Sequence, residues 1–76
     1  MAKKQSDQYA ACADALESWA TLNEFLRGAP EDIAQALLNL ERGGKRRVQY
    51  LLRIHARYNK MRAQRERAEL LKGAAV

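Results

Sequence analysis

The sequence has few of the residues that cross-link a small fold through covalent bonds or metals. Cys12 is the only cysteine and His55 the only histidine among 76 residues. A single thiol excludes an intramolecular disulfide and a cysteine-based metal cluster. We therefore expect no metal and no other cofactor, and the reducing cytoplasm is the expected compartment.

Long apolar runs are also missing. No stretch approaches the ~20 apolar residues that a membrane span requires. The first residues carry charge, but no apolar segment of the signal-peptide kind follows them. The sequence therefore predicts a protein without membrane contact.

Glycine and proline are scarce and interrupt the chain at two places, Gly28-Ala29-Pro30 and Gly43-Gly44, apart from Gly73 near the end. The uninterrupted segments predict helices over about 6–27, 30–42 and 45–72. We expect one all-α domain, residues 1–76, with two long antiparallel helices joined through a short one. A lone core of this size is marginally stable, which favours association with a second copy.

The first segment has the apolar spacing of an amphipathic helix. Apolar residues recur at intervals of three and four and share one face: Cys12, Leu16, Trp19, Leu22 and Leu26. Ser6 or Asp7 is expected to cap the start of this helix. Gly28 is expected to end it in the left-handed conformation.

Charge is divided by position along the chain. Through Glu41 there are three cations against seven acids, whereas from Arg42 onward there are eleven cations against two acids, Glu66 and Glu69. Such asymmetry indicates either a polyanionic partner for the basic half or electrostatic packing of one half on the other.

The third segment separates into two faces when its residues are placed on a helix. The apolar arc, which is expected to face other helices, consists of Val48, Tyr50, Leu51, Leu52, Ile54, His55, Tyr58 and Met61. Opposite it, cations seven residues apart form a row about 30 Å long, with Arg57 between them: Arg46, Arg53, Lys60 and Arg67. A charged helix face is usually solvated, but such a face normally mixes signs. This row contains no acid, and arginine suits phosphates better than lysine does.

The start of the third segment also indicates an anionic partner. Lys45, Arg46 and Arg47 fall in the expected first helical turn, where the helix dipole makes cations unfavourable unless an anion compensates. Three cations and free backbone N–H groups together predict a phosphate site. A helix-turn-helix motif is not supported, because Leu38 and Leu40 stand where its glycine belongs.

The remaining polar residues do not form a catalytic arrangement. His55 falls on the apolar arc, so we expect it in the core or in a subunit interface. The serines and threonine have no base in their sequence context, and we expect no catalytic residue. The chain is not expected to be an enzyme.

These patterns predict a small regulatory protein that binds DNA or RNA through phosphates and forms a homodimer. The expected nucleic-acid-binding residues are Lys45, Arg46, Arg47, Arg53, Arg57, Lys60 and Arg67. The expected dimer strip is Ile54, Met61, Ala68 and Leu71. The alternative function is a helical adaptor or inhibitor that docks on a protein partner. In a third interpretation the charged halves of two subunits neutralise each other.

Overall fold

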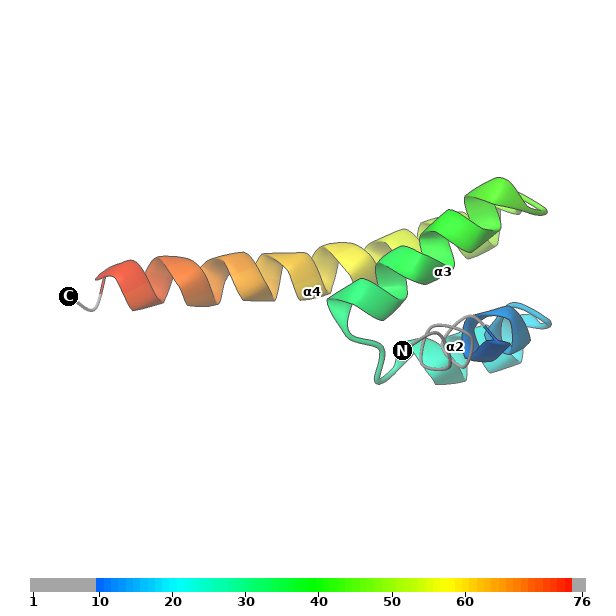
Figure 1. The fold of residues 1–76 in the computed structure, drawn as a ribbon, viewed down its shortest axis with the longest axis horizontal. Coiled ribbons are helices and arrows are strands. Elements are labelled where there is room, and N and C mark those ends of the chain that lie inside the picture. Colours follow the sequence, from blue (N-terminus) through cyan, green and yellow to red (C-terminus); the bar gives the residue numbers. More distant parts are fainter. Residues whose placement is uncertain (1–9, 75–76) are drawn as a thin grey trace.

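The structure, a computed structural model, describes residues 10–74. All regular structure in this range is helical: residues 10–15, α2 (Trp19–Leu26), α3 (Glu31–Gly43) and α4 (Val48–Ala74). The predicted all-α class is therefore confirmed for this range. Helices α2 and α3 lie against the N-terminal half of α4, and the rest of α4 extends beyond them (Figure 1). The caps expected at Ser6 and Asp7 fall outside the described residues.

The prediction of one helix over 6–27 is wrong within the described range. The chain leaves the helix after residue 15 and begins α2 at Trp19. Ser18 has extended backbone angles, and its Oγ accepts the backbone N–H of Thr21 at 3.1 Å, while Thr21 Oγ1 accepts that of Ser18 at 3.1 Å. This reciprocal capping box gives α2 its own start. Within residues 10–74, the first of the two expected long helices is accordingly replaced by two helical segments, 10–15 and α2.

Helix α3 follows the sequence signals closely. Pro30 precedes it with φ −73° and ψ 173°, and Glu31 and Asp32 occupy its first turn, where negative charge is favourable. The helix includes Gly43, one residue beyond the predicted end. The expected left-handed conformation at Gly28 is wrong, because no glycine among residues 10–74 has a positive φ.

The core is a small cluster in which each helix takes part. Its largest apolar members have no exposed surface: Leu22 and Leu26 of α2, Leu37 of α3 and Ile54 of α4. Cys12 and Ala15 join the same cluster. The turn at residues 16–17 separates the 10–15 segment from α2, and both segments pack on the same core.

Helix α4 contributes less to this core than its apolar arc predicts. Ile54 is its one buried residue within the described range, whereas Val48 and Leu52 are 68% and 65% exposed. The expectation that His55 lies in the core of this chain is wrong: its ring is exposed and makes a 3.2 Å hydrogen bond to the side chain of Asn59. Five of the eight residues of the apolar arc are thus buried or half-buried against the other helices, while Val48, Leu52 and His55 are exposed.

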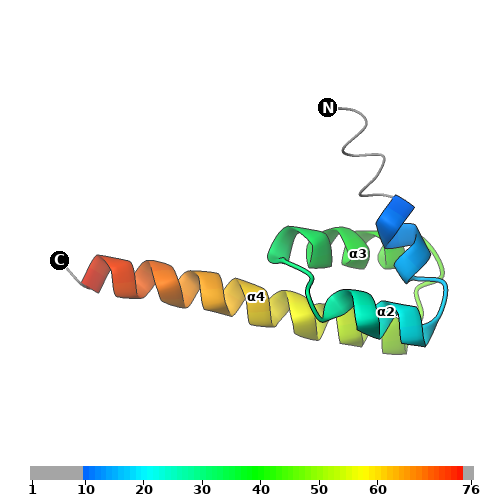
Figure 2. The same cartoon turned by 90° about the horizontal axis from the view of Figure 1, so that it is seen from below.

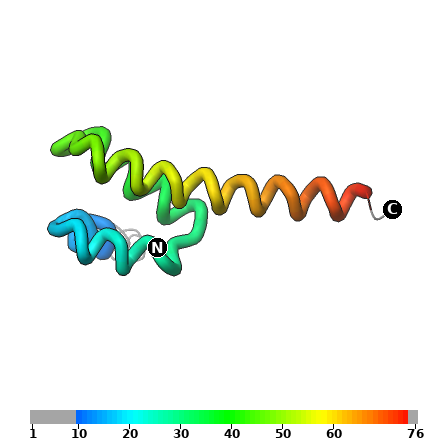
Figure 3. The backbone as a smooth tube through the Cα atoms, turned by 180° about the vertical axis from the view of Figure 1, so that it is seen from behind, coloured from blue at the N-terminus to red at the C-terminus, as the bar shows by residue number. Residues whose placement is uncertain are grey.

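The second half of α4 stands clear of the other helices. Residues 62–74 are all exposed, and they project past the ends of α2 and α3 in two perpendicular views (Figures 1 and 2). The view from behind shows the same free segment (Figure 3). The molecule measures 46 × 32 × 21 Å along its principal axes, and this projection accounts for the elongation.

Candidate functional site

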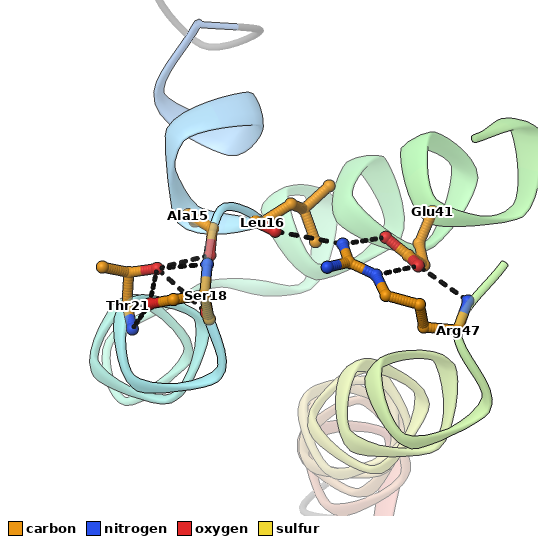
Figure 4. A network of polar contacts seen from close by, with 6 residues as sticks. All are labelled: Ala15, Leu16, Ser18, Thr21, Glu41 and Arg47. Atoms are coloured by element: carbon orange, nitrogen blue, oxygen red, sulfur yellow. Dashed lines mark hydrogen bonds and ion pairs between the residues drawn. The ribbon is translucent and has the colours of Figure 1, made fainter. Parts of the chain in front are cut away.

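The turn between α3 and α4 is built around a buried carboxylate. Glu41 is 2% exposed and accepts three hydrogen bonds from Arg47: from the backbone N–H and Nε to Oε2, and from Nη2 to Oε1, each at 2.8 Å (Figure 4). These charge-assisted bonds hold the pKa of the Glu41 carboxyl below its ordinary value of 4.5, the side-chain bond from Arg47 being the main cause. The same pairing raises the pKa of Arg47.

Arg47 also connects the first helix to this turn. Its Nη2 donates to the carbonyl of Leu16 at 3.0 Å, and its guanidinium lies 3.6 Å from the centre of the Tyr50 ring. Tyr50 in turn meets the edge of Trp19 with ring centres 5.5 Å apart. Arg47 therefore has its charge paired inside the fold, with Nε and Nη2 both hydrogen-bonded, and the Tyr50 ring packs on its guanidinium.

The phosphate site expected at the start of α4 assumed that the helix begins at residue 45, which is three residues before its observed start. Helix α4 begins at Val48, so Lys45 and Arg46 lie in the turn before it, Arg46 with a left-handed φ of 54°. The anion that compensates the positive helix end is Glu41 of the same chain, which receives the N–H of Arg47. Lys45 and Arg46 remain exposed cations in this turn.

Further along α4, two arginines are held in place by one nitrogen each. Arg53 Nε donates to Asn23 Oδ1 of α2 at 2.7 Å, and Arg57 Nε donates to the carbonyl of Ala29 at 2.9 Å. Their Nη groups have no hydrogen-bond partner among residues 10–74. Each guanidinium is thus oriented by the fold while four of its five N–H donors remain available.

These two side chains border an open hollow between α2 and α4. The hollow has a volume of about 360 Å³ and is lined by Leu26, Arg27, Arg53, Ala56, Arg57 and Lys60. Four of the six lining residues are cations and none is an acid. The C-terminal end of α2, whose dipole is favourable for cations, contributes Leu26 and Arg27. We call this feature the basic hollow.

The basic row continues from the basic hollow along the free half of α4. Arg67 follows Lys60 by seven residues, so it lies on the same side about 10 Å further on. Among residues 10–74, Arg65 is the other arginine, besides Arg47, that pairs with an acid: it binds Glu31 of α3 at 2.7 Å and Glu69 at 3.0 Å. These bonds lower the pKa of Glu31 and raise that of Arg65.

The structure therefore divides the seven predicted site residues into three groups. Arg53, Arg57 and Lys60 meet in the basic hollow, Arg67 lies beyond it on the same helix, and Lys45, Arg46 and Arg47 belong to the α3–α4 turn. Arg27 was missed, because it lies in the acidic part of the sequence and only the contact of α2 with α4 brings it to the others. No periodic signal in the sequence could have identified it.

The rest of the described chain offers little metal or thiol chemistry. Residues 10–74 contain no group of three histidine, cysteine or acidic side chains that could hold a metal ion. Burial raises the pKa of the Cys12 thiol, which disfavours the reactive thiolate. No helix within the described range is long and apolar enough to cross a membrane.

Comparison of this chain with models of known protein families, with curated proteins and with solved structures finds no match.

Proposed function

We propose that this protein binds the phosphate backbone of a nucleic acid through the basic hollow and the basic row that continues from it. The supporting observation is the grouping of Arg27, Arg53, Arg57 and Lys60 around one open hollow without a lining acid. Like charges at close range repel each other, so an anionic ligand that enters the hollow gains interactions with several cations at once.

The geometry favours backbone contacts over base recognition. The cations lie along α4 and at the end of α2, spaced by about one or two helical turns, an arrangement that suits the repeated phosphates of a backbone. Phosphate contacts fix a protein on a nucleic acid but carry no sequence information. We therefore expect binding that depends little on the nucleic-acid sequence. In the regulatory role that we propose, the presence of the protein on the nucleic acid is what regulates.

Arginine in the basic hollow is suited to this role by its preorganisation. Arg53 and Arg57 are half-buried and held at Nε, so little side-chain entropy remains to be lost when their Nη groups bind a phosphate. Arg27, Lys60 and Arg67 are exposed and supply the longer-range attraction.

The test is binding of fluorescently labelled single-stranded RNA, single-stranded DNA and duplex DNA by anisotropy over a range of salt concentrations. If five cations contact phosphates, the log–log salt slope on duplex DNA should be roughly −4 to −5. The paired charge reversal Arg27→Glu with Lys60→Glu should weaken binding and reduce the magnitude of the slope by about 2. Both side chains are exposed and neither makes a hydrogen bond to another residue among 10–74, so circular dichroism should not change.

The matched control is Lys45→Glu with Arg46→Glu, which changes the total charge equally in the α3–α4 turn. Both side chains are exposed, and acids near the start of α4 suit the helix dipole. Binding should fall much less in this control. Equal loss in both variants would mean that only net charge matters, and wild-type binding by the Arg27/Lys60 variant would refute the proposal.

A protein partner is the alternative that such a negative result would favour. An acidic protein surface could engage the same cations, and the same two variants would then be compared in binding to that partner.

A further inference from the structure

Helix α4 carries exposed apolar side chains at both ends of one face. Val48 and Leu52 are 68% and 65% exposed near its start, and Leu70 is 74% exposed near its end. Leu52 and Leu70 are separated by 18 residues, about five helical turns, so they point in the same direction. The line between them contains the exposed or half-buried residues His55, Asn59, Ala63 and Glu66. We call the line from Val48 to Leu70 the outer face of α4.

The rest of the described chain leaves this face uncovered. Helix α3 packs on the opposite side, where Ile54 is buried and Tyr58 and Met61 are half-buried. Beyond Met61, the hydrogen bonds between α4 and the other helices of the described chain are those from Arg65 to Glu31. An isolated helix of this length is marginal in water. The free half of α4 therefore lacks the tertiary packing that normally stabilises a helix.

We propose that the outer face binds the outer face of a second copy, with the two α4 helices antiparallel and a two-fold axis near Asn59. In this register Val48 of one copy lies level with Leu70 of the other, and His55 lies level with Ala63. The apolar ends of the face, Val48 and Leu70, thus meet across the interface, while Leu52 lies level with Glu66 of the other copy. One patch serves both subunits, which is the requirement for a closed two-fold dimer.

The shape of the molecule selects the antiparallel orientation. Helices α2 and α3 occupy the side of only the N-terminal half of α4 (Figure 2). Parallel pairing would set the two unsupported free halves against each other. Antiparallel pairing sets the free half of each α4 against the N-terminal half of the partner's α4, which is supported from behind by α2 and α3.

Charge on the outer face favours the same orientation. Glu66 is the acid on this face, and parallel pairing would set it against its own copy. In the antiparallel register Glu66 lies about 4.5 Å along the axis from His55 of the second copy, within reach of both side chains. Like charges opposed across an interface are unfavourable, whereas a carboxylate beside an imidazole is neutral or attractive.

This interface differs from the strip expected from the sequence. Ile54 of that strip is buried within its own subunit, and Leu71 points about 100° away from Leu70. The two adjacent leucines are similarly exposed, at 74% and 63%, so they form a matched pair for mutation.

The first experiment is sedimentation equilibrium of three proteins without nucleic acid. Wild type and Leu71→Glu should sediment as dimers at micromolar concentration. Leu70→Glu should sediment as the monomer, with a loss of helical circular dichroism no larger than the free half of α4 accounts for. A monomeric wild type would overturn the proposal. So would a dimer in Leu70→Glu, or a monomer produced by Leu71→Glu alone.

The second experiment tests orientation by cross-linking in a Cys12→Ala background. Oxidised Asn59→Cys should form a covalent dimer because this residue lies at the proposed axis, whereas Gln64→Cys, on the other side of the helix, should not. Leu70→Cys alone should also fail to cross-link, but mixing it with Val48→Cys should produce a covalent heterodimer. Efficient cross-linking of Leu70→Cys with itself would indicate parallel helices and refute the antiparallel pairing.

The dimer and the proposed nucleic-acid contact can fail independently, since both experiments omit nucleic acid. The two-fold axis is perpendicular to the plane that contains both helices. A feature on one side of this plane in one subunit therefore lies on the same side of the plane in the other subunit. The two basic hollows would therefore open on one side of the dimer.

Discussion

Two arginine–glutamate pairs join α3 to α4, one at each end of α3, and they differ in their access to water. Glu41 and Arg47 have side chains 2% and 27% exposed, whereas Glu31 and Arg65 have side chains 26% and 51% exposed. Both pairs use two guanidinium nitrogens on one carboxylate. Only the first pair also binds backbone groups, through the N–H of Arg47 and the carbonyl of Leu16.

The comparison shows that the same chemical pair has two different roles. Where water is excluded, an unpaired charge is strongly unfavourable, so the Glu41–Arg47 pair determines the conformation of the turn and the start of α4. Where water has access, solvent screens the attraction, so the Glu31–Arg65 pair adds little to stability and mainly directs α4 along the end of α3.

The largest expected effect is at the buried pair. Glu41→Gln should lower the free energy of unfolding by about 3 kcal/mol or more, because it leaves Arg47 partly buried without a counter-charge. Urea unfolding followed by circular dichroism measures this loss. Glu31→Gln is the control and should unfold nearly like wild type. Equal losses at the two sites would contradict the distinction between the pairs.

The second prediction concerns acid. The pKa of Glu41 is lowered from an ordinary value of 4.5, so its contribution is complete above that pH and is lost as pH falls through the folded-state pKa. The urea midpoint of wild type should therefore decrease steadily below about pH 4.5. The double replacement Glu41→Leu with Arg47→Met removes both charges and should flatten this decrease, whereas Glu31→Gln should leave most of it. A wild-type decrease retained in the double variant would exclude Glu41 as its source.

A smaller effect is expected at the break before α2, where the carbonyl of Leu16 accepts a hydrogen bond from Arg47. Ser18→Ala removes the oxygen that caps α2 and should cost about 1 kcal/mol. Ser18→Asp keeps a capping oxygen and should recover most of that stability. Thermal unfolding of both variants and wild type, followed by circular dichroism, measures the difference. If both variants unfold like wild type, the break between residues 15 and 19 does not depend on this cap.

The smallest effect is expected at the exposed pair. Arg65→Gln should lower the melting temperature only slightly at low salt, because the pair is solvent-screened. The difference from wild type should disappear near 1 M salt, where the screening length is about 3 Å. A difference that persists at high salt would show that Arg65 acts through packing rather than charge.

Some of these features could be predicted from the sequence and others could not. The two interruptions at glycine and proline correctly divided the chain before α3 and before α4. The break at Ser18 was missed because the apolar spacing from Cys12 to Leu26 continues across it, and Thr21 does not match the usual glutamate or glutamine of a capping box. Nothing in the sequence distinguishes Glu41 from the other acids of the acidic half, because its role depends on its burial in the fold.

The sequence by itself determined that the described chain is helical and that its longest helix is the C-terminal one. Helical hydrogen bonds join residues four positions apart, so local composition and spacing are sufficient to specify them. The tertiary structure decided which cations are neutralised. Arg47 and Arg65 have acidic partners, while Arg27 joins Arg53, Arg57 and Lys60 around one hollow. Charges interact across space rather than along the chain, and the fold sets the distances between residues that are far apart in sequence.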